Sequence, residues 1–125
     1  MKDSPLSVRI TTPEREALDA LAVLRTCPSG TLAASYIAEG VRRSRFPAID
    51  FRDGFPGRVA YLTGTRWPVW MIVDLVAELE NDVASAAKRV RRPSALLEMA
   101  LRYAAAYPDE ITAAQQLGQD LEAAA

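Results

Sequence analysis

The sequence predicts a mainly α-helical protein in which one strand and two helices are followed by a small helical domain. The first observation is that residues 6–11 alternate apolar and polar side chains, which is the period of a β-strand. The second is that apolar residues beyond residue 12 recur mainly at helical spacing. The third is that residues 46–66 are rich in Pro, Gly and Asp and separate two groups of predicted helices.

The predicted strand has one apolar and one polar face. Its apolar side chains are Leu6, Val8 and Ile10, and its polar side chains are Ser7, Arg9 and Thr11. A single strand leaves its backbone N–H and C=O groups unpaired. We therefore expect it to pair antiparallel with the same residues of a second copy, so that the apolar face forms the core of a homodimer. A two-stranded ribbon of this kind fits the major groove of B-DNA.

Two helices are predicted directly after the strand. Thr12 is a suitable cap and Pro13 suits the first helical position, so the first helix runs from there to about Arg25. A turn at residues 27–30 breaks it, and Thr31 opens a second helix that ends in a basic stretch at residues 42–45. One strand and two helices bury too little apolar surface to be stable alone, which again favours a dimer.

The remaining chain is predicted to be a connector and a helical domain. We place the domain boundaries at residues 1–45, 46–66 and 67–125, with a short strand at Arg58–Leu62 in the connector and a turn at residues 63–65. Four helices follow. Pro68 starts the first, Asn81 and Asp82 cap the second, and the third and fourth begin after residue 93 and at residue 108.

The composition favours a protein without enzymatic activity. The chain has no histidine, so the commonest metal ligand and the commonest general base are both missing. Its single cysteine, Cys27, has no second cysteine for a disulfide and no histidine to activate it, and we interpret it as structural. The Asp residues show no spacing suited to acid–base or metal chemistry. We therefore predict neither a catalytic residue, a metal ion nor a cofactor.

Charge and hydropathy suggest a cytoplasmic protein. No apolar stretch approaches the roughly 20 residues that cross a bilayer, and no secretory leader opens the chain, so we expect no membrane association. The formal net charge of -1 is unevenly distributed. Residues 1–66 carry ten Lys or Arg and seven Asp or Glu, and residues 67–125 carry five and nine. The first part is therefore suited to an anion, and the second faces either a basic partner or none.

Residues 6–45 resemble the ribbon-helix-helix DNA-binding fold of bacterial repressors and antitoxins. The resemblance lies in LSVRIT, then PEREALDALAVLR, then TLAASYIAEGVRRSR. It implies that Ser7, Arg9 and Thr11 contact DNA bases. It also implies that the amino terminus of the second helix, at Ser29, Gly30 and Thr31, binds a DNA phosphate, for which free N–H groups are physically suited.

Residues 46–115 are similar to a small helical family of domains of unknown function. The similarity lies in GRVAYL, in GTR followed by PVW, and in YPDEI, whereas residues 80–93 depart from the family pattern. That family is related to homeodomain-like helix-turn-helix modules and occurs in antitoxins encoded beside PIN-domain ribonuclease toxins. The resemblance implies that the partner of this chain is a PIN-type toxin.

Three further features keep two interpretations each. The basic side chains of Lys88, Arg89, Arg91 and Arg92 are candidates for a second DNA contact, or they form a solvated helix end. Arg42, Arg43 and Arg45 close a helix in the same way. The aromatic residues Tyr61, Trp67 and Trp70 either form a recognition surface or seal the core of the second domain.

Together these observations predict an antitoxin of a type II toxin-antitoxin system that also represses its own operon by binding operator DNA. One alternative is a ribbon-helix-helix repressor without a toxin. Another is a dimeric protein-interaction module that does not bind DNA.

Overall fold

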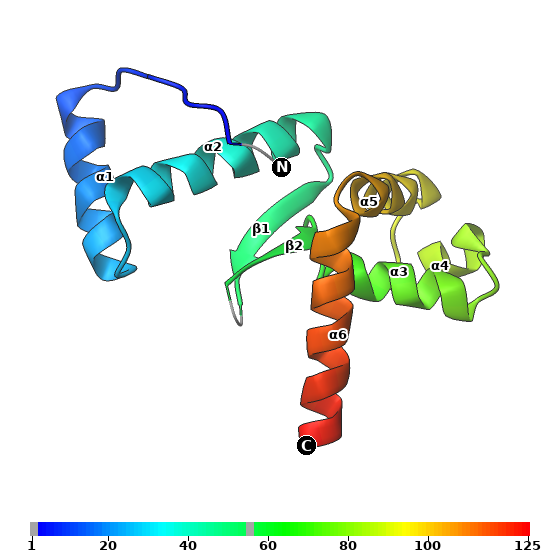
Figure 1. Ribbon diagram of the computed structural model, residues 1–125. Helices are drawn as coiled ribbons and strands as arrows, with labels where there is room; N and C mark the ends of the chain where they lie inside the picture. The colour runs from blue at the N-terminus through cyan, green and yellow to red at the C-terminus, as the bar shows by residue number, and fades with distance from the viewer. Residues whose placement is uncertain (1–2, 55–56) are drawn as a thin grey trace. The chain divides into compact units, whose positions relative to one another are not determined.

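Six helices and two strands make up the computed structural model, which describes residues 3–54 and 57–125 (Figure 1). The helices are α1 (Thr12–Leu24), α2 (Ser29–Arg45), α3 (Val69–Glu78), α4 (Val83–Val90), α5 (Ser94–Ala106) and α6 (Pro108–Ala124). The strands are β1 (Ile49–Asp53) and β2 (Arg58–Leu62). The predicted mainly helical class is confirmed. The chain divides into two compact units, Met1–Gly40 and Val41–Ala125.

The first unit contains α1 and most of α2. Thr11, and not Thr12, caps α1, because its hydroxyl accepts a 3.4 Å hydrogen bond from the Glu14 N–H. Helix α2 begins two residues before the predicted Thr31, and the Leu32 N–H donates its first helical bond, 3.1 Å long, to the Pro28 carbonyl.

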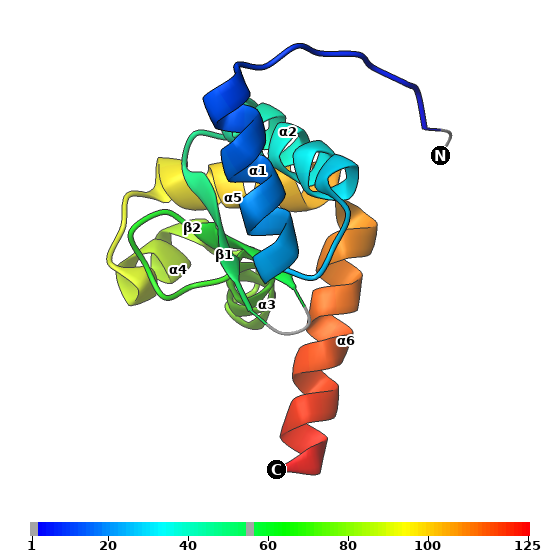
Figure 2. The ribbon, with the colours of Figure 1, turned by 90° about the vertical axis from the view of Figure 1, so that its left-hand side faces the viewer.

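Residues 3–11 form neither a helix nor a strand in the single chain (Figure 2). The predicted strand at Leu6–Thr11 is therefore not present in the isolated protomer. A strand requires a hydrogen-bonded neighbour, and the residues described in one copy supply none to this segment. Pairing with a second copy stays a prediction.

Residues 46–66, expected to be a connector with one strand, form a β-hairpin that belongs to the second unit. The predicted strand Arg58–Leu62 is confirmed as β2, and β1 pairs with it antiparallel from Ile49 opposite Leu62 to Asp53 opposite Arg58. Strand β1 was not predicted, although Ile49 and Phe51 alternate with polar neighbours. The predicted turn at residues 63–65 follows β2, and Gly64 adopts the left-handed conformation there, at φ 75°.

The four helices predicted after residue 67 are confirmed as α3 to α6. Asp82 caps α4 as expected, since its carboxylate accepts a 3.2 Å hydrogen bond from the Ser85 N–H. The carboxyl-terminal part of α6 projects from the second unit in both ribbon views (Figures 1 and 2). None of the described helices is long and apolar enough to cross a membrane.

The core of the second unit lies between the hairpin and the helices. One face of the hairpin, with Ile49, Ala60 and Leu62, packs on α3 and α5, which also pack on each other. Helices α4 and α6 complete the unit by packing on this α3–α5 pair. The core side chains from the helices include Val69, Ile72, Val76, Ala86, Val90, Leu97, Ala100, Tyr103 and Ile111. Burial of this size explains why residues 41–125 form a compact unit.

Candidate nucleic-acid interface

The alternating segment at the amino terminus leaves its apolar side chains in solvent. Leu6 is 73% exposed, Val8 59% and Ile10 50%, and these three residues are the predicted dimer core. Exposed single apolar residues are common on proteins, whereas a row of three on one face of an extended segment forms a patch.

The two helices of the first unit extend this apolar surface. Within residues 3–40, Ala22 and Leu32 are the buried side chains. Larger side chains on the same helices remain exposed, namely Leu21, Val23, Leu24, Tyr36 and Ile37. Two buried side chains contribute little compared with the conformational entropy that ordering about 40 residues costs. Most of the large apolar side chains of the first unit are thus exposed.

The predicted base-contacting residues have different surroundings. Ser7 and Arg9 are exposed in the segment that precedes α1. A strand that paired with this segment would set the direction of both side chains. Thr11 is exposed as well, but its hydroxyl already accepts the Glu14 N–H as the cap of α1. Thr11 therefore stabilises the start of α1, in addition to any contact that it makes with DNA.

The predicted phosphate site at the amino terminus of α2 is partly occupied by the protein itself. The Ser29 hydroxyl donates a 2.6 Å hydrogen bond to the Asp19 carboxylate of α1. This bond, together with the Arg15 guanidinium, holds the pKa of Asp19 below its ordinary value, so the carboxylate is ionised at neutral pH. A negative charge beside Ser29 disfavours a phosphate there. The N–H groups of Gly30 and Thr31 precede the first helical bond and remain the better phosphate donors.

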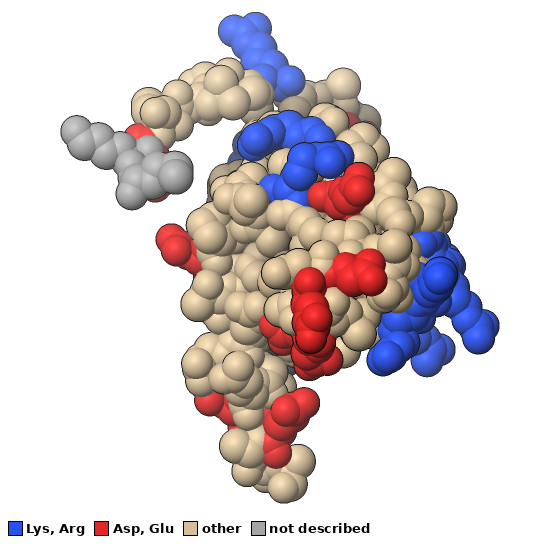
Figure 3. Space-filling view, turned by 90° about the vertical axis from the view of Figure 1, so that its right-hand side faces the viewer, with Lys and Arg blue, Asp and Glu red and all other residues tan. Residues whose placement is uncertain are grey.

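The second predicted contact forms a basic surface on the second unit. Lys88, Arg89 and Arg91 are exposed around the carboxyl end of α4, and Figure 3 shows Lys and Arg gathered along one edge of the face that it presents. Arg91 ends α4 in the left-handed conformation, at φ 62°. The three-residue turn then leads directly into α5, and the same turn lines a shallow depression with Lys88 and Ser94.

Arg92 differs from its neighbours because it stabilises the turn. Its guanidinium donates to the Gly64 carbonyl at 2.9 Å and to the Arg91 carbonyl at 2.8 Å. It therefore joins the α4–α5 turn to the turn after β2. Of the four predicted residues, Lys88, Arg89 and Arg91 are the ones available to a polyanion.

Two of the three cations at the end of α2 form hydrogen bonds with side chains of the second unit. Arg42 donates to the Tyr103 hydroxyl at 3.0 Å and to the Glu110 carboxylate at 2.5 Å, and its guanidinium lies 4.0 Å from the centre of the Tyr107 ring. Arg45 donates to the Tyr107 hydroxyl at 3.0 Å. Sequence reasoning missed this cluster, whose one local signal is the helical spacing of the two tyrosines. Arg43 is exposed.

The aromatic residues mainly serve the core. Trp67 and Trp70 are half-buried against it, and Tyr61 lies beneath the Arg52 guanidinium at 4.4 Å. Cys27 is half-buried and unpaired by any disulfide. Among the described residues no group of three or more potential metal ligands is found.

No family model, curated protein or solved structure matches this chain.

Proposed function

We propose that this chain is a homodimeric, DNA-binding antitoxin that represses its own operon. The observation that carries the DNA-binding part is the exposed apolar row of Leu6, Val8 and Ile10, in a segment with which none of the described strands pairs. Pairing this segment with the same segment of a second copy satisfies its backbone groups and buries the row at once. The exposed apolar residues of α1 and α2 then gain a second pair of helices to pack on.

The same pairing presents the polar face of the ribbon to DNA. Ser7 and Arg9 alternate with the buried residues, so they lie together on the outer face, twice in each dimer. Arginine recognises guanine by two hydrogen bonds to its O6 and N7 atoms. Arg9 is therefore the residue proposed to provide most of the sequence specificity, with Ser7 and Thr11 beside it.

Phosphate contacts would position the ribbon on the duplex. The N–H groups of Gly30 and Thr31 lie at a helix amino terminus, where the helix dipole favours an anion. The exposed Lys88, Arg89 and Arg91 add a second region of positive charge.

The toxin part of the proposal is supported by the charge of the second unit and by the family resemblance of residues 46–115. Helix α6 carries four carboxylates and no Lys or Arg. An acidic helix is suited to a basic surface on a partner protein. We propose that this partner is a PIN-type ribonuclease and that binding neutralises it.

A gel-shift assay with the DNA upstream of the coding sequence tests DNA binding. We expect retardation that weakens steeply as salt is raised, because phosphate contacts release counterions. Arg9→Ala should cost about 1–3 kcal/mol on this DNA and little on random DNA. Arg102→Ala, which removes an exposed arginine of α5, is the matched control and should bind like the wild type. No retardation at any salt would exclude the DNA-binding function.

The interaction module without DNA binding remains the second candidate. The observation in its favour is that the hydroxyls of Thr11 and Ser29, two predicted DNA contacts, are already used within the protein. The two candidates differ in the gel shift and agree on the dimer. A dimer that retards no DNA would support the second candidate.

A further inference from the structure

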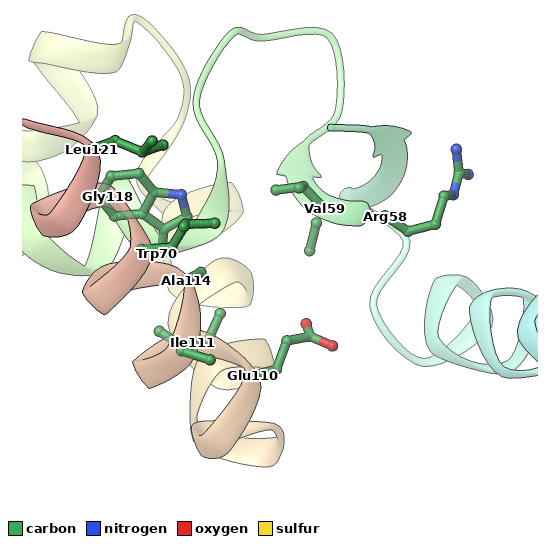
Figure 4. A pocket seen from close by; sticks show the side chains of 11 residues that line it. Arg58, Val59, Trp70, Glu110, Ile111, Ala114, Gly118 and Leu121 are labelled. Atoms are coloured by element: carbon green, nitrogen blue, oxygen red, sulfur yellow. The ribbon is translucent and has the colours of Figure 1, made fainter. Parts of the chain in front are cut away.

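Two depressions of the second unit differ in chemistry. One, of about 420 Å³, lies between β2 and α6 and has mainly apolar walls, with Trp70 on the α6 side (Figure 4). Its charged lining residues, Glu110 and Arg58, already form ion pairs with Arg42 and Asp53. The other depression, of about 520 Å³, lies at the α4–α5 turn and is lined by cations. The charges of this second depression are the ones available to a ligand.

The cations around the α4–α5 turn are not neutralised by the protein itself. Lys88, Arg89, Arg91 and Arg92 lie within five positions of one another, and residues 83–97 contain no Asp or Glu. Among the described residues, none of the four forms an ion pair with an acidic side chain. Like charges gathered in this way repel one another. An anionic ligand would relieve this repulsion.

The helix dipoles account for only part of this charge. Lys88 and Arg89 lie in the last turn of α4, where a cation is favoured. Arg91 and Arg92 also lie directly before α5, whose amino terminus is the positive end of its dipole and whose first turn contains no acidic residue. A solvated helix end therefore explains Lys88 and Arg89 better than Arg91 and Arg92.

A fifth cation comes from the turn after β2. The Arg92 guanidinium donates to the Gly64 carbonyl at 2.9 Å and so joins the two turns. Arg66 follows Gly64 by two positions, so their Cα atoms lie no more than about 8 Å apart. The Arg66 side chain is exposed, and no described acidic side chain forms an ion pair with it. The two joined turns thus carry a single group of cations.

The backbone on both sides of Arg66 is fixed by hydrogen bonds. The Thr65 hydroxyl donates to the Leu62 carbonyl at 2.8 Å and accepts from the Trp67 N–H at 3.0 Å. The Arg52 guanidinium donates to the Thr65 carbonyl at 2.7 Å. A ligand that binds Arg66 has to order only its side chain, which reduces the entropic cost of binding.

We propose that the turns at residues 63–66 and 91–93 form one surface that binds the phosphate backbone of duplex DNA without reading its sequence. Arg66 and Arg91 contact phosphates, and Arg92 is a positioning residue that holds the two turns together. A duplex carries one charge per about 1.7 Å of its axis, so its phosphates match several neighbouring cations. The inference deepens the DNA-binding proposal by adding Arg66 and Arg92, and it rests on that proposal for the ligand being DNA.

The probe is a mixed-sequence duplex of about 20 base pairs, unrelated to the upstream DNA and titrated into the full-length protein by fluorescence anisotropy at several salt concentrations. Arg66→Ala should reduce the slope of log affinity against log salt by about 0.9, as expected for one lost phosphate contact. Arg102→Ala removes an exposed cation of α5 outside the depression and should keep the wild-type slope. A wild-type slope in Arg66→Ala would overturn the proposal.

A substitution that keeps the charge tests the positioning role of Arg92. Arg92→Lys lacks the planar fork that bonds to the Gly64 and Arg91 carbonyls. If Arg92 positions Arg66, the effects of the two substitutions are not additive, and Arg66→Ala should change the slope by less than half of 0.9 in the Arg92→Lys background. A change of about 0.9 in both backgrounds would contradict this role.

Polyglutamate with the same number of charges tests a different ligand. We expect it to bind more weakly than the duplex, by about tenfold or more, because its charges are less closely spaced. Binding as tight as that of the duplex, with the same loss in Arg66→Ala, would assign the surface to an acidic protein and overturn DNA as the ligand.

The outcomes for this surface and for the ribbon are separable. The probe lacks the upstream sequence, so its binding does not require that Arg9 recognise a base. If Arg9→Ala lost specificity on the upstream DNA while Arg66→Ala kept the wild-type slope, the ribbon would be supported and this surface would be excluded.

Discussion

The hydroxyl of Tyr103 donates a 2.6 Å hydrogen bond to the carboxylate of Glu110. Arg42 donates to both groups, so one cation, one phenol and one carboxylate from α2, α5 and α6 form a closed set of polar contacts. The Tyr103 ring is fully buried and meets the Phe46 ring edge to face, with 5.4 Å between the centres. This cluster attaches the end of α2 to the helices of the second unit.

Tyr103→Phe should destabilise the second unit. The substitution keeps the ring and removes the hydroxyl that joins Arg42 to Glu110, so we expect the free energy of unfolding to fall by about 1–3 kcal/mol. Denaturant unfolding followed by circular dichroism measures the change. Tyr61→Phe is the control, because the Tyr61 ring stacks under Arg52 and its hydroxyl has no hydrogen bond among the described residues. Equal losses in both variants would show that the polar cluster is not stabilising.

The stability of the second unit should also decrease in alkaline solution. Burial, followed by the hydrogen bond to Glu110, raises the pKa of Tyr103 above its ordinary value of 10.0. The folded protein therefore holds this proton more tightly than the unfolded chain. The resulting stabilisation is complete below about pH 10 and is lost as the pH rises through the folded-state pKa. Unfolding measured at about pH 8 and pH 11 should show the decline in the wild type and a smaller one in Tyr103→Phe.

Two helical glycines should respond to alanine with opposite signs. A Cβ atom at Gly118 would lie 2.6 Å from the Trp70 ring, so Gly118→Ala should lower the free energy of unfolding by about 1–3 kcal/mol. A Cβ at Gly40, within α2, meets no atom within 4 Å. Gly40→Ala should therefore stabilise the protein by about 0.5–1 kcal/mol through helix propensity. Thermal unfolding of the two variants measures both effects, and a stabilising Gly118→Ala would contradict the close packing of α6 on Trp70.

The proposed ribbon predicts a position-dependent effect on the dimer. Val8→Lys places a charge on the apolar row and should give a monomer at micromolar concentration in sedimentation. Ser7→Lys adds the same charge one residue earlier, on the polar face, and should remain a dimer. If Val8→Lys also sedimented as a dimer, the segment would not be the interface.

The basic surface predicts a change in salt dependence. If Arg91 contacts a phosphate, Arg91→Ala should reduce the slope of log affinity against log salt by about 0.9. The control is Arg102→Ala, which removes an exposed cation of α5 outside the depression formed by the α4–α5 turn. A slope that is the same in both variants and the wild type would favour the solvated helix end.

The sequence alone determined the local structure of the second unit. The cap at Asp82, the proline at the first position of α6 and the apolar spacing of α3 were sufficient to place these helices, because such signals depend on residues only a few positions apart. Strand β2 was found for the same reason. Strand β1 was missed because it lies in a segment whose Pro, Gly and Asp residues are typical of a connector, and its pairing with β2 stabilises it there.

Only the tertiary structure decided what several charged residues do. Arg42 bonds to Tyr103, which follows it by 61 positions, and to Glu110, which follows it by 68. Arg92 bonds to Gly64, which precedes it by 28 positions. No sequence pattern relates residues so far apart, since their distance depends on how the helices pack. For Leu6–Thr11 the sequence determined the alternation, whereas the structure leaves its apolar side chains exposed and pairs no described strand with it.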